Sequence, residues 1–312
     1  MLQSTLIMDR SVLNPHLKDI SIDYLYHLGL DSSMDIKSMF GDTKFVCMGG
    51  SSERAKDFAE KIADALGLSV PEGEGLKPIG KTERFSLYKV GSVISVSHGM
   101  GMPSMSILLN EITKLLHYAK CTDPLFIRIG TSGGIGIKPG SVVITEQAVN
   151  AELEPVFEHV TLGSRKYCST NVDTLLAKQL LNIKEPFPVV QGKTMGTDDF
   201  YEGQARFDGA LDPPYSIEER ELFWKRAHVR GVRNIDMEST MFTAFCTRAH
   251  IRAAIVCAVL VDRLEGDQVT VPLEQLTEYS DNAQKLVLDF IINHLPYPTP
   301  TTVSTTASEA PR

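Results

Sequence analysis

Residues 126–134, FIRIGTSGG, place one guanidinium, two hydroxyls and three glycines in a single short stretch. Gly130–Gly134 matches G-x-S-x-G, the nucleophile elbow of serine hydrolases, in which Ser132 would attack the substrate. The same residues also fit a strand that runs into a turn of small residues. The N–H groups of such a turn, together with Arg128, would bind an anion. One interpretation requires a protein nucleophile, and the other requires a bound anion.

The residues after this stretch argue against the hydrolase interpretation. A nucleophile elbow requires a strand, a sharp turn and then a helix. Here IGIKPGSVVITE follows, in which further glycines and a proline lead into another strand. Arg128 favours the anion site, because a guanidinium in a strand of Leu, Phe and Ile needs an anion or another acceptor. A glycine turn without a ligand is the remaining alternative.

A second candidate anion site is FVCMGGSSERAK, in which glycines separate a strand from a helix. Helix N-termini attract anions. Arg54 falls in the first helical turn, where the helix dipole disfavours a cation unless an anion is shared. The segment lacks the Lys-Ser/Thr of a P-loop and the G-x-G-x-x-G of a dinucleotide-binding fold. A surface arginine without a ligand is the alternative.

Two further segments carry groups suited to a planar heterocycle and a sugar. In DDFYEGQARFDG, Gln204 and Arg206 offer donors and an acceptor, and Phe200 offers a stacking surface. In RNIDMESTMFTAFC, Asp236 and Glu238 point to the same side of an extended strand and could accept from vicinal hydroxyls. The alternatives are a polar surface loop for the first segment and a helix N-cap for the second.

Alternating strands and helices must position these segments. Strands are expected at 44–48, 85–90, 93–97, 125–130, 141–146, 188–195, 232–236 and 253–261. Helices are expected at 51–68, 103–119, 216–229, 239–249 and 273–294. This alternation predicts a single α/β domain with a mixed sheet between helices. The domain is expected over 23–295, between an N-terminal arm at 1–22 and a disordered Pro/Thr/Ser-rich tail at 296–312.

Composition excludes several classes of protein. The chain has 312 residues, 43% hydrophobic and 22% charged, as in a soluble globular enzyme. Its net charge of −8 and the lack of a Lys/Arg run argue against nucleic-acid binding. Five scattered cysteines favour reduced thiols in a cytoplasmic protein over disulfides or a zinc site. No signal peptide or membrane span is expected, because no basic n-region precedes an apolar run and no stretch approaches 18 apolar residues.

Together these segments resemble the uridine phosphorylase family, within the superfamily of hexameric purine and uridine phosphorylases. The resemblance is carried, in order along the chain, by MGGSSERAK, TERF, SVSHGMGMPSMSI, IRIGTSGGIG, PGSVVITE, TDDFYEGQARFDG, NIDMEST and RLEGDQ. FYEGQ-R marks the pyrimidine branch, and DYLYHLGL is similar to the animal enzymes. The resemblance implies a mixed, barrel-like sheet flanked by helices. It also implies the reversible conversion of uridine and phosphate to uracil and ribose 1-phosphate, with deoxyuridine or thymidine as further candidate substrates.

The resemblance assigns roles to individual residues. Phosphate would be held by Gly50, Arg54, Arg128, Thr131 and, in the neighbouring subunit, Arg84. Ribose would be contacted by Thr131, Met237, Glu238 and, across a dimer interface at the 5′-hydroxyl, His27. Uracil would be held by Gly133, Phe200, Gln204 and Arg206. Catalysis would depend on Arg206, Arg128, Gln204 and Glu238.

The implied reaction needs neither a cofactor nor a protein nucleophile, because phosphate itself attacks C1′ of the ribose. Catalysis then consists of positioning and electrostatic stabilisation. The cross-subunit roles of His27 and Arg84 require a homo-oligomer, and a dimer is expected. No metal is expected, because Phe85 occupies the position where bacterial members have a cation-binding Glu.

Two positions depart from the family pattern. Asp236 stands where a Glu is usual, so the carboxylate reaches one methylene less far toward ribose. Asp262 stands where uridine phosphorylases have Asn, and purine nucleoside phosphorylases have an acidic residue nearby. A purine nucleoside phosphorylase is therefore one alternative, although Gln204 and Arg206 argue against it. A catalytically inactive nucleoside-binding homologue is the other, although it would be expected to have lost one of the site residues.

Overall fold

The computed structural model describes residues 14–68, 75–80 and 82–295. Contacts divide the chain into two compact units. The first comprises residues up to Gly99, Ile107–Leu125 and the residues from Ile291 onward, and the second comprises Met100–Ser106 and Phe126–Phe290. The predicted tail at 296–312 and the first part of the predicted arm, 1–13, lie outside the described residues.

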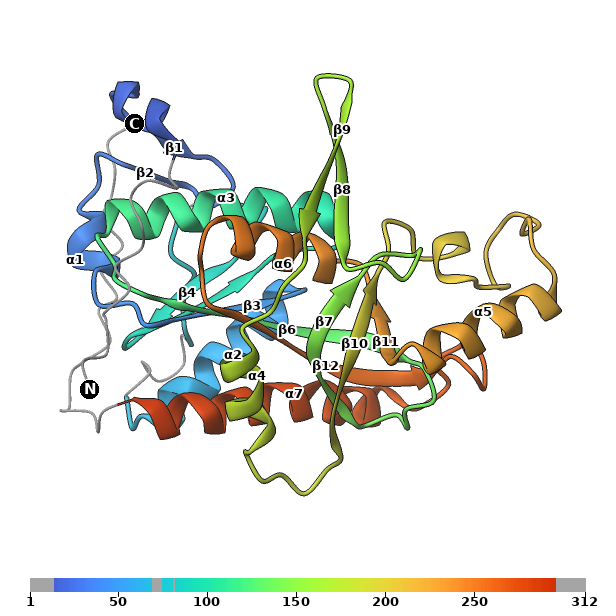
Figure 1. The fold of residues 1–312 in the computed structure, drawn as a ribbon. Coiled ribbons are helices and arrows are strands. Elements are labelled where there is room, and N and C mark those ends of the chain that lie inside the picture. Colours follow the sequence, from blue (N-terminus) through green and yellow to red (C-terminus); the bar gives the residue numbers. More distant parts are fainter. Residues whose placement is uncertain (1–13, 69–74, 81, 296–312) are drawn as a thin grey trace, which may run out of the picture. The chain divides into compact units, whose positions relative to one another are not determined.

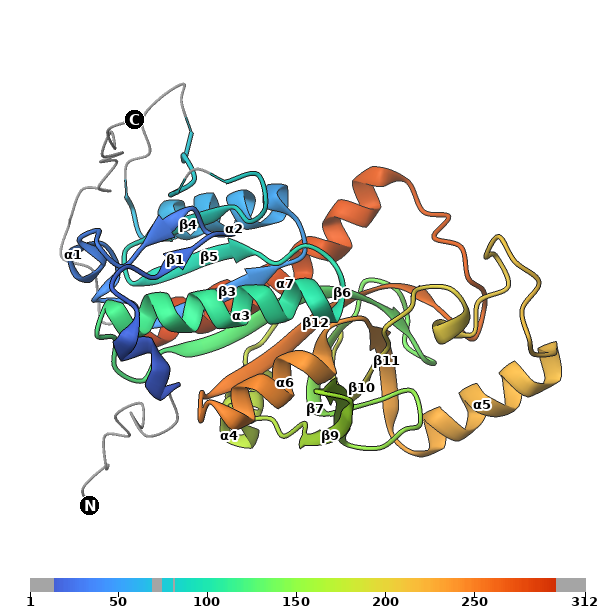
Figure 2. The ribbon, with the colours of Figure 1, turned by 90° about the horizontal axis from the view of Figure 1, so that it is seen from above.

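The first unit contains three paired β-strands. Its strands lie in the order β3 (Phe45–Gly49), β5 (Val93–Ser97) and β4 (Leu87–Val90). β3 is parallel to β5, and β4 and β5, which lie within two of the expected strands, form an antiparallel hairpin. Helix α2 (Ser52–Ala65) packs against these strands, as Figure 2 shows. Its buried residues are the apolar positions that the helical spacing predicts. Ser51 caps the helix by accepting a hydrogen bond from the N–H of Arg54.

The N-terminal part of the first unit is a string of short elements. The 3-10 helix η2 (Pro15–Asp19), which buries no residue, lies within the predicted arm. The short strands β1 (Tyr24–Leu25) and β2 (Leu30–Asp31) pair with each other, and helix α1 (Ile36–Phe40) follows. The C-terminal part of α3 (Gly101–Tyr118) also belongs to this unit.

The second unit is built around a closed barrel of mixed strand direction. Its strands are β6 (Leu125–Gly134), β7 (Val142–Val149), β10 (Val189–Gly196), β11 (Val232–Asp236) and β12 (Ala253–Asp262), seen in Figure 1. They follow the order β11-β10-β7-β12-β6, and β11 pairs back to β6. The pairs are parallel except for β12 with β7 and β11 with β6. The expected α/β class with a barrel-like mixed sheet is confirmed.

Closure of the barrel corrects the expected end of one strand. The sequence predicts a strand at 125–130 and a turn at 131–134, whereas β6 continues to Gly134. Gly133 and Gly134 pair with Ile235 and Asn234 of β11 on one side and with the end of β12 on the other. The prediction of a turn was wrong because this long-range pairing keeps the glycines extended. Local composition alone favours a bend there.

Helices of the second unit lie against the barrel strands. They are α4 (Thr174–Leu181), α5 (Ile217–Val229), α6 (Ser239–Arg248) and α7 (Leu273–His294), the last extending beyond Phe290 into the first unit. A capping box of Ser216 and Glu219 starts α5, and Asp173 caps the unpredicted α4. Within the described ranges, no helix combines the length and the hydrophobicity needed to cross a lipid bilayer.

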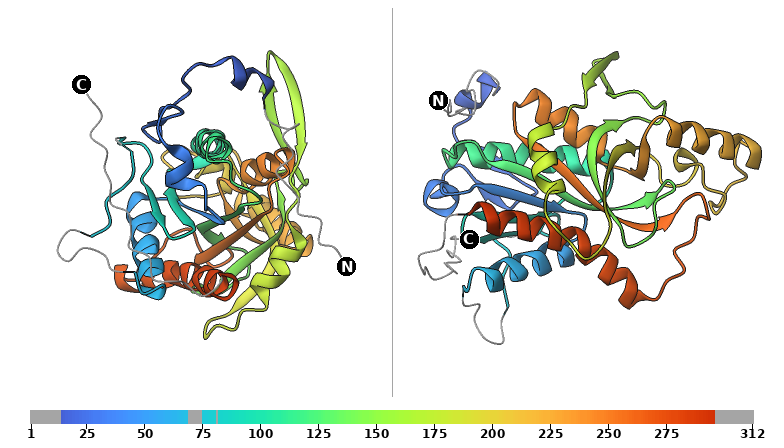
Figure 3. Two further views of the ribbon diagram at one scale, coloured as in Figure 1. Left: turned by 90° about the vertical axis from the view of Figure 1, so that its left-hand side faces the viewer. Right: turned by 60° about the horizontal axis from the view of Figure 1, so that its bottom comes forward.

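An antiparallel hairpin of the second unit was also not predicted. Its strands, β8 (Val156–Thr161) and β9 (Ser164–Ser169), extend away from the barrel strands in Figures 1 and 3. Both strands are largely exposed, so neither face carries the apolar alternation that marks a half-buried strand.

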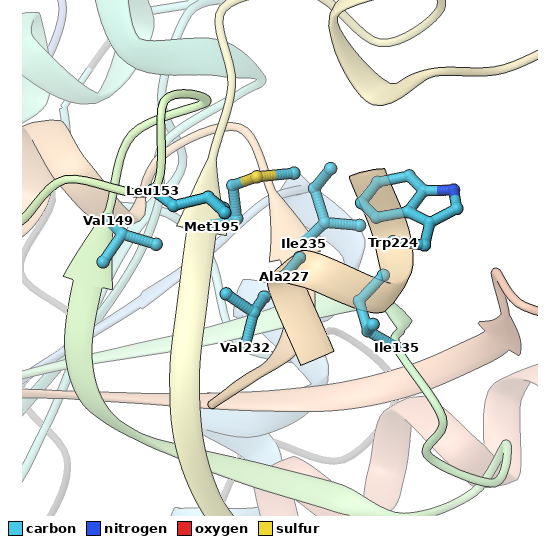
Figure 4. Close-up of a cluster of buried hydrophobic side chains, with 8 residues drawn as sticks. All are labelled: Ile135, Val149, Leu153, Met195, Trp224, Ala227, Val232 and Ile235. Carbon is cyan, nitrogen blue, oxygen red and sulfur yellow. The ribbon is translucent and has the colours of Figure 1, made fainter. Parts of the chain in front are cut away.

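A buried apolar cluster joins α5 to the barrel strands. Figure 4 shows its members: Ile135, Val149, Leu153, Met195, Trp224, Ala227, Val232 and Ile235. Trp224, the only tryptophan of the chain, is buried on α5, and Ile135 lies directly after β6. The cluster therefore supports the end of the barrel at which β6 and β11 pair.

Replacing Ile135 by Ala should lower the free energy of unfolding by about 2–5 kcal/mol, because it leaves a cavity in this cluster. Urea unfolding followed by Trp224 fluorescence measures the loss. Val229→Ala, at an exposed position on α5, is the matched control and should change the stability by less than about 0.5 kcal/mol. Equal losses in the two variants would contradict a packing role for the cluster.

Candidate active site

Arg128 lies on β6 with only 2% of its surface exposed. Its Nη1 donates to Asp236 Oδ2 at 2.6 Å, and its Nη2 donates to Glu238 Oε2 at 2.5 Å. Burial opposes the charge, but the attraction of Asp236 and Glu238 outweighs it and raises the pKa of Arg128. The second unit therefore holds a permanent cation between two carboxylates.

Asp236, the last residue of β11, is fully engaged by neighbouring donors. Besides Arg128, its oxygens accept from the N–H of Glu238 at 3.4 Å and from the N–H and hydroxyl of Ser239, the N–H at 3.2 Å. Burial raises the pKa of Asp236, and the charge of Arg128 opposes this shift. Asp236 therefore anchors Arg128 and also accepts from the first N–H of α6, which is closer to the helix-cap alternative than to a sugar acceptor.

Glu238 is held less completely than Asp236. Its Oε2 accepts from Arg128, and its Oε1 accepts from the N–H of Gly101 at 2.6 Å. Met237, between the two carboxylates, is only partly buried. The Nε–H of Arg128 has no acceptor among the described residues, although it is buried. A buried donor of this kind is a site for an anion or for water.

The glycine and serine of GTSGG have structural explanations. A Cβ on Gly130 would lie 2.7 Å from Arg128 Nη1, so only glycine leaves room for the guanidinium two residues back. Ser132 donates to the carbonyl of Ala258 at 3.1 Å and accepts from Asn234 Nδ2 at 3.0 Å. Neither partner is a general base, so this geometry gives no support to a serine nucleophile. Thr131, between Gly130 and Ser132, is partly exposed.

A second polar cluster surrounds Arg206. Its guanidinium carbon lies 4.4 Å from the centre of the Phe200 ring, a cation–π arrangement. Asp208 accepts from Arg206 Nε at 2.7 Å and from Nη2 at 2.5 Å, and this bidentate bond raises the pKa of Arg206. Gln204 is 96% buried in the short 3-10 helix η3 (Glu202–Gln204), whereas Phe200 is 42% exposed. The cluster thus offers an aromatic face beside a cation and a buried amide.

Arg263 belongs to this cluster, although sequence analysis assigned it no role. Its Nη1 donates to Gln204 Oε1 at 3.2 Å, its Nη2 donates to Gln204 O at 2.7 Å, and Asp267 pairs with it at 2.9 Å. A Cβ on Gly133 would lie 2.8 Å from Arg263 Cγ, which explains that glycine. The signal that could have found Arg263 is a guanidinium directly after an apolar strand, an extension of the argument that singled out Arg128 inside one.

Asp262 points to backbone groups. Its Oδ1 accepts from the N–H groups of Gly136 and Leu264, each at 3.0 Å. The carboxylate therefore stabilises the end of β12 and the loop after β6.

The first unit holds the remaining predicted site residues, and two of them come together. The guanidinium of Arg54 folds back over Gly50, where a Cβ would lie 2.5 Å from Arg54 Nη2. Ser51 Oγ accepts from the N–H and Nε of Arg54 at 3.2 and 3.4 Å. Arg84 is exposed, and His27, partly exposed, lies beside Phe85 and Glu111.

The distribution of the predicted residues follows the two units. The second unit contains those expected at the base, the ribose and part of the phosphate: Arg128, Thr131, Gly133, Phe200, Gln204, Arg206, Met237 and Glu238. The first contains His27, Gly50, Arg54 and Arg84. Each unit therefore carries its own group of arginines and polar residues.

Neither the acidic residues nor the cysteines form a metal site in the described ranges. No group of three or more His, Cys, Asp or Glu side chains is arranged there to hold a metal ion. All five cysteines are free, and burial raises the pKa of Cys257, whose sulfur accepts from Arg128, to about 12. Cys257 is therefore a neutral thiol beside the arginine.

Comparison with known proteins identifies the family. The model of the phosphorylase superfamily matches residues 44–292, which span both units. Uridine phosphorylase 1 of Mus musculus is 48% identical over 282 residues, which are 89% of this chain and 90% of that protein. The chain therefore belongs to the phosphorylase superfamily and, within it, to the uridine phosphorylase family.

Solved structures and a second relative extend the comparison. The uridine phosphorylase of Schistosoma mansoni in complex with uracil matches with a TM-score of 0.86 at 41% identity, over 90% of this chain and 98% of that one. The same enzyme in complex with thymidine also matches with a TM-score of 0.86. Inactive uridine phosphorylase B of the same organism is 39% identical over 90% of this chain and 95% of its own length. The family thus includes an inactive member.

Replacing Asp236 by Ala should lower the free energy of unfolding by about 3–5 kcal/mol, because Arg128 keeps its buried charge and loses a partner. Urea unfolding measures the change. The control Glu158→Ala removes the exposed ion pair with Arg165 on the β8–β9 hairpin and should cost no more than about 1 kcal/mol. A loss for Asp236→Ala no larger than for the control would contradict the anchoring role.

Proposed function

We propose that this protein catalyses the reversible phosphorolysis of uridine to uracil and ribose 1-phosphate, a pentosyl transfer that serves pyrimidine salvage. The observation that carries the proposal is the loop cluster of Phe200, Gln204 and Arg206, which offers a stacking face, an amide and a cation to one planar base. Membership of the uridine phosphorylase family supports it. Deoxyuridine and thymidine are further candidate substrates.

Uracil recognition follows from the hydrogen bonds already made by the cluster. Arg263 donates to Gln204 Oε1 and so orients the amide, whose NH₂ is left to donate to a uracil carbonyl. The second lone pair of Oε1 accepts from N3–H. Arg206, kept cationic by Asp208, stabilises the negative charge that develops at O4 as the base leaves. Phe200 stacks on the ring, and Gly133 lines the pocket.

The ribose and phosphate groups are assigned by the same reasoning. Arg128, with its unused Nε–H, would hold phosphate together with Gly50, Arg54, Thr131 and, from a neighbouring subunit, Arg84. Glu238 would accept from the 2′-hydroxyl, with Met237 beside the sugar. Asp236 has no free oxygen, so we assign it the positioning of Arg128 and leave ribose to Glu238.

Phosphate is the nucleophile in this scheme, and its attack on C1′ needs no cofactor or metal. The proposed enzyme is a homodimer, because His27 and Arg84 would complete the site of a neighbouring subunit. Its proposed location is the cytoplasm. Its proposed ligands are the nucleoside, its base, phosphate and ribose 1-phosphate. Neither nucleic acid nor a membrane is a proposed partner.

Two alternatives make different use of the same residues. A purine nucleoside phosphorylase would need Asp262 as a proton donor to the base. Its Oδ1 instead accepts from the backbone N–H groups of Gly136 and Leu264, so this oxygen is already engaged at the end of β12. An inactive homologue is the second alternative, since such a relative exists. Arg128, Gln204, Arg206 and Glu238 are all present here, which favours the active enzyme.

Side-by-side kinetics with uridine and inosine test the function. Phosphate-dependent cleavage of uridine should exceed that of inosine by about 10⁴-fold in kcat/KM, because a pocket built to hydrogen-bond one base leaves polar groups unpaired with another. Faster cleavage of inosine would support the purine alternative. Calorimetric binding of uracil without turnover of either nucleoside would support the inactive one.

Replacing Arg206 by Ala should lower kcat about 10²–10³-fold, because it removes the cation that stabilises the leaving base. The KM for phosphate should not change, because other residues, such as Arg128 and Arg54, are proposed to hold phosphate. Ser132→Ala, in the stretch that resembles a nucleophile elbow, is the control and should retain most of the activity. Near-normal turnover of Arg206→Ala would contradict its role, and an inactive, folded Ser132→Ala would reopen the nucleophile interpretation.

A further inference from the structure

Helix α3 binds the segment that carries His27 through one polar face. Lys114 Nζ and the Tyr118 hydroxyl both donate to Asp23, at 2.8 and 2.7 Å. Leu25 and Leu28 are fully buried on either side of the turn that contains His27. Within the first unit, the backbone around His27 therefore has a fixed position.

Glu111, one turn before Lys114 on α3, adds a contact to the His27 side chain itself. Its Oε2 accepts from the N–H groups of His27 and Leu28 at 2.9 and 3.1 Å. Its Oε1 lies 2.7 Å from His27 Nδ1. Glu111 is 93% buried, whereas 35% of the His27 side chain is exposed. Holding the backbone needs only Oε2, so the bond to the ring is a separate feature.

The bond between Glu111 and His27 determines which ring nitrogen carries the proton. An ionised carboxylate can only accept, so Nδ1 of His27 is the donor. In the neutral imidazole, Nε2 is then a hydrogen-bond acceptor. The Phe85 ring, centred 5.9 Å from the imidazole, packs beside it. Glu111 sets the tautomer, and Phe85 limits the rotation of the ring.

We propose that Glu111 is a positioning residue for the phosphorylase reaction: it holds His27 as the Nδ1–H tautomer, so that Nε2 accepts a hydrogen bond from the 5′-hydroxyl of the nucleoside. The inference rests on the proposed function, in which His27 contacts that hydroxyl. In this scheme, the preference for nucleosides that carry a 5′-hydroxyl depends on a buried carboxylate that does not touch the substrate.

Glu111→Gln tests the inference with little change in shape. The amide oxygen can still accept from the two backbone N–H groups, but the amide NH₂ donates to Nδ1 and stabilises the opposite tautomer. With uridine, kcat/KM should fall about tenfold, through KM, because Nε2 then carries the proton and can no longer accept from the 5′-hydroxyl. With 5′-deoxyuridine, which lacks the hydroxyl, kcat/KM should not change.

Three further variants separate positioning from stability. Tyr118→Phe removes a contact of the same helix to Asp23 and should leave the preference for uridine over 5′-deoxyuridine unchanged. His27→Ala should lower that preference, and adding Glu111→Gln to it should lower it no further. Equal losses on both substrates, or a full additional loss in the double variant, would overturn the inference. No cleavage of uridine by the unmodified protein would instead overturn the proposed function.

Discussion

The burial of Arg128 is the constraint on which the second unit depends. A guanidinium with 2% of its surface exposed requires compensating charge, and Asp236 and Glu238 provide it from the end of β11 and the start of α6. The strand and the helix must therefore meet at β6. The same pairing leaves one buried donor of the arginine, Nε–H, unused in the described structure.

Several local features follow from this arrangement. Gly130 is required because the guanidinium lies over it, and Asp236 uses one oxygen for Arg128 and the other for the first N–H of α6. Closure of the barrel through Gly133 and Gly134 brings β11 beside β6, within reach of Arg128. The side of Gly133 that has no Cβ is filled by Arg263, which in turn orients Gln204. The cluster around Arg128 and the cluster around Gln204 and Arg206 therefore both contact β6.

Much of the fold could be predicted because the signals are local. The spacing of Ala55, Phe58 and Ile62 predicts α2, and the alternation around Gly91 predicts the β4–β5 hairpin. The β8–β9 hairpin could not be predicted, because its exposed strands bury too little to show a pattern. Arg263 was missed because its partner, Gln204, lies far away in the sequence and is brought close only by the barrel.

Residue chemistry was determined by the sequence alone. Arg128 within an apolar strand, Gln204 with Arg206 near Phe200, and the Asp236–Glu238 pair predict sites for an anion, a planar base and a sugar. Only the tertiary structure decided what each polar atom does. It brings Asp236 within hydrogen-bond distance of Arg128, Asp262 of two backbone N–H groups, and Glu111 of His27. The physical reason is that a carboxylate accepts from the nearest donors, and packing between distant segments sets which donors are near.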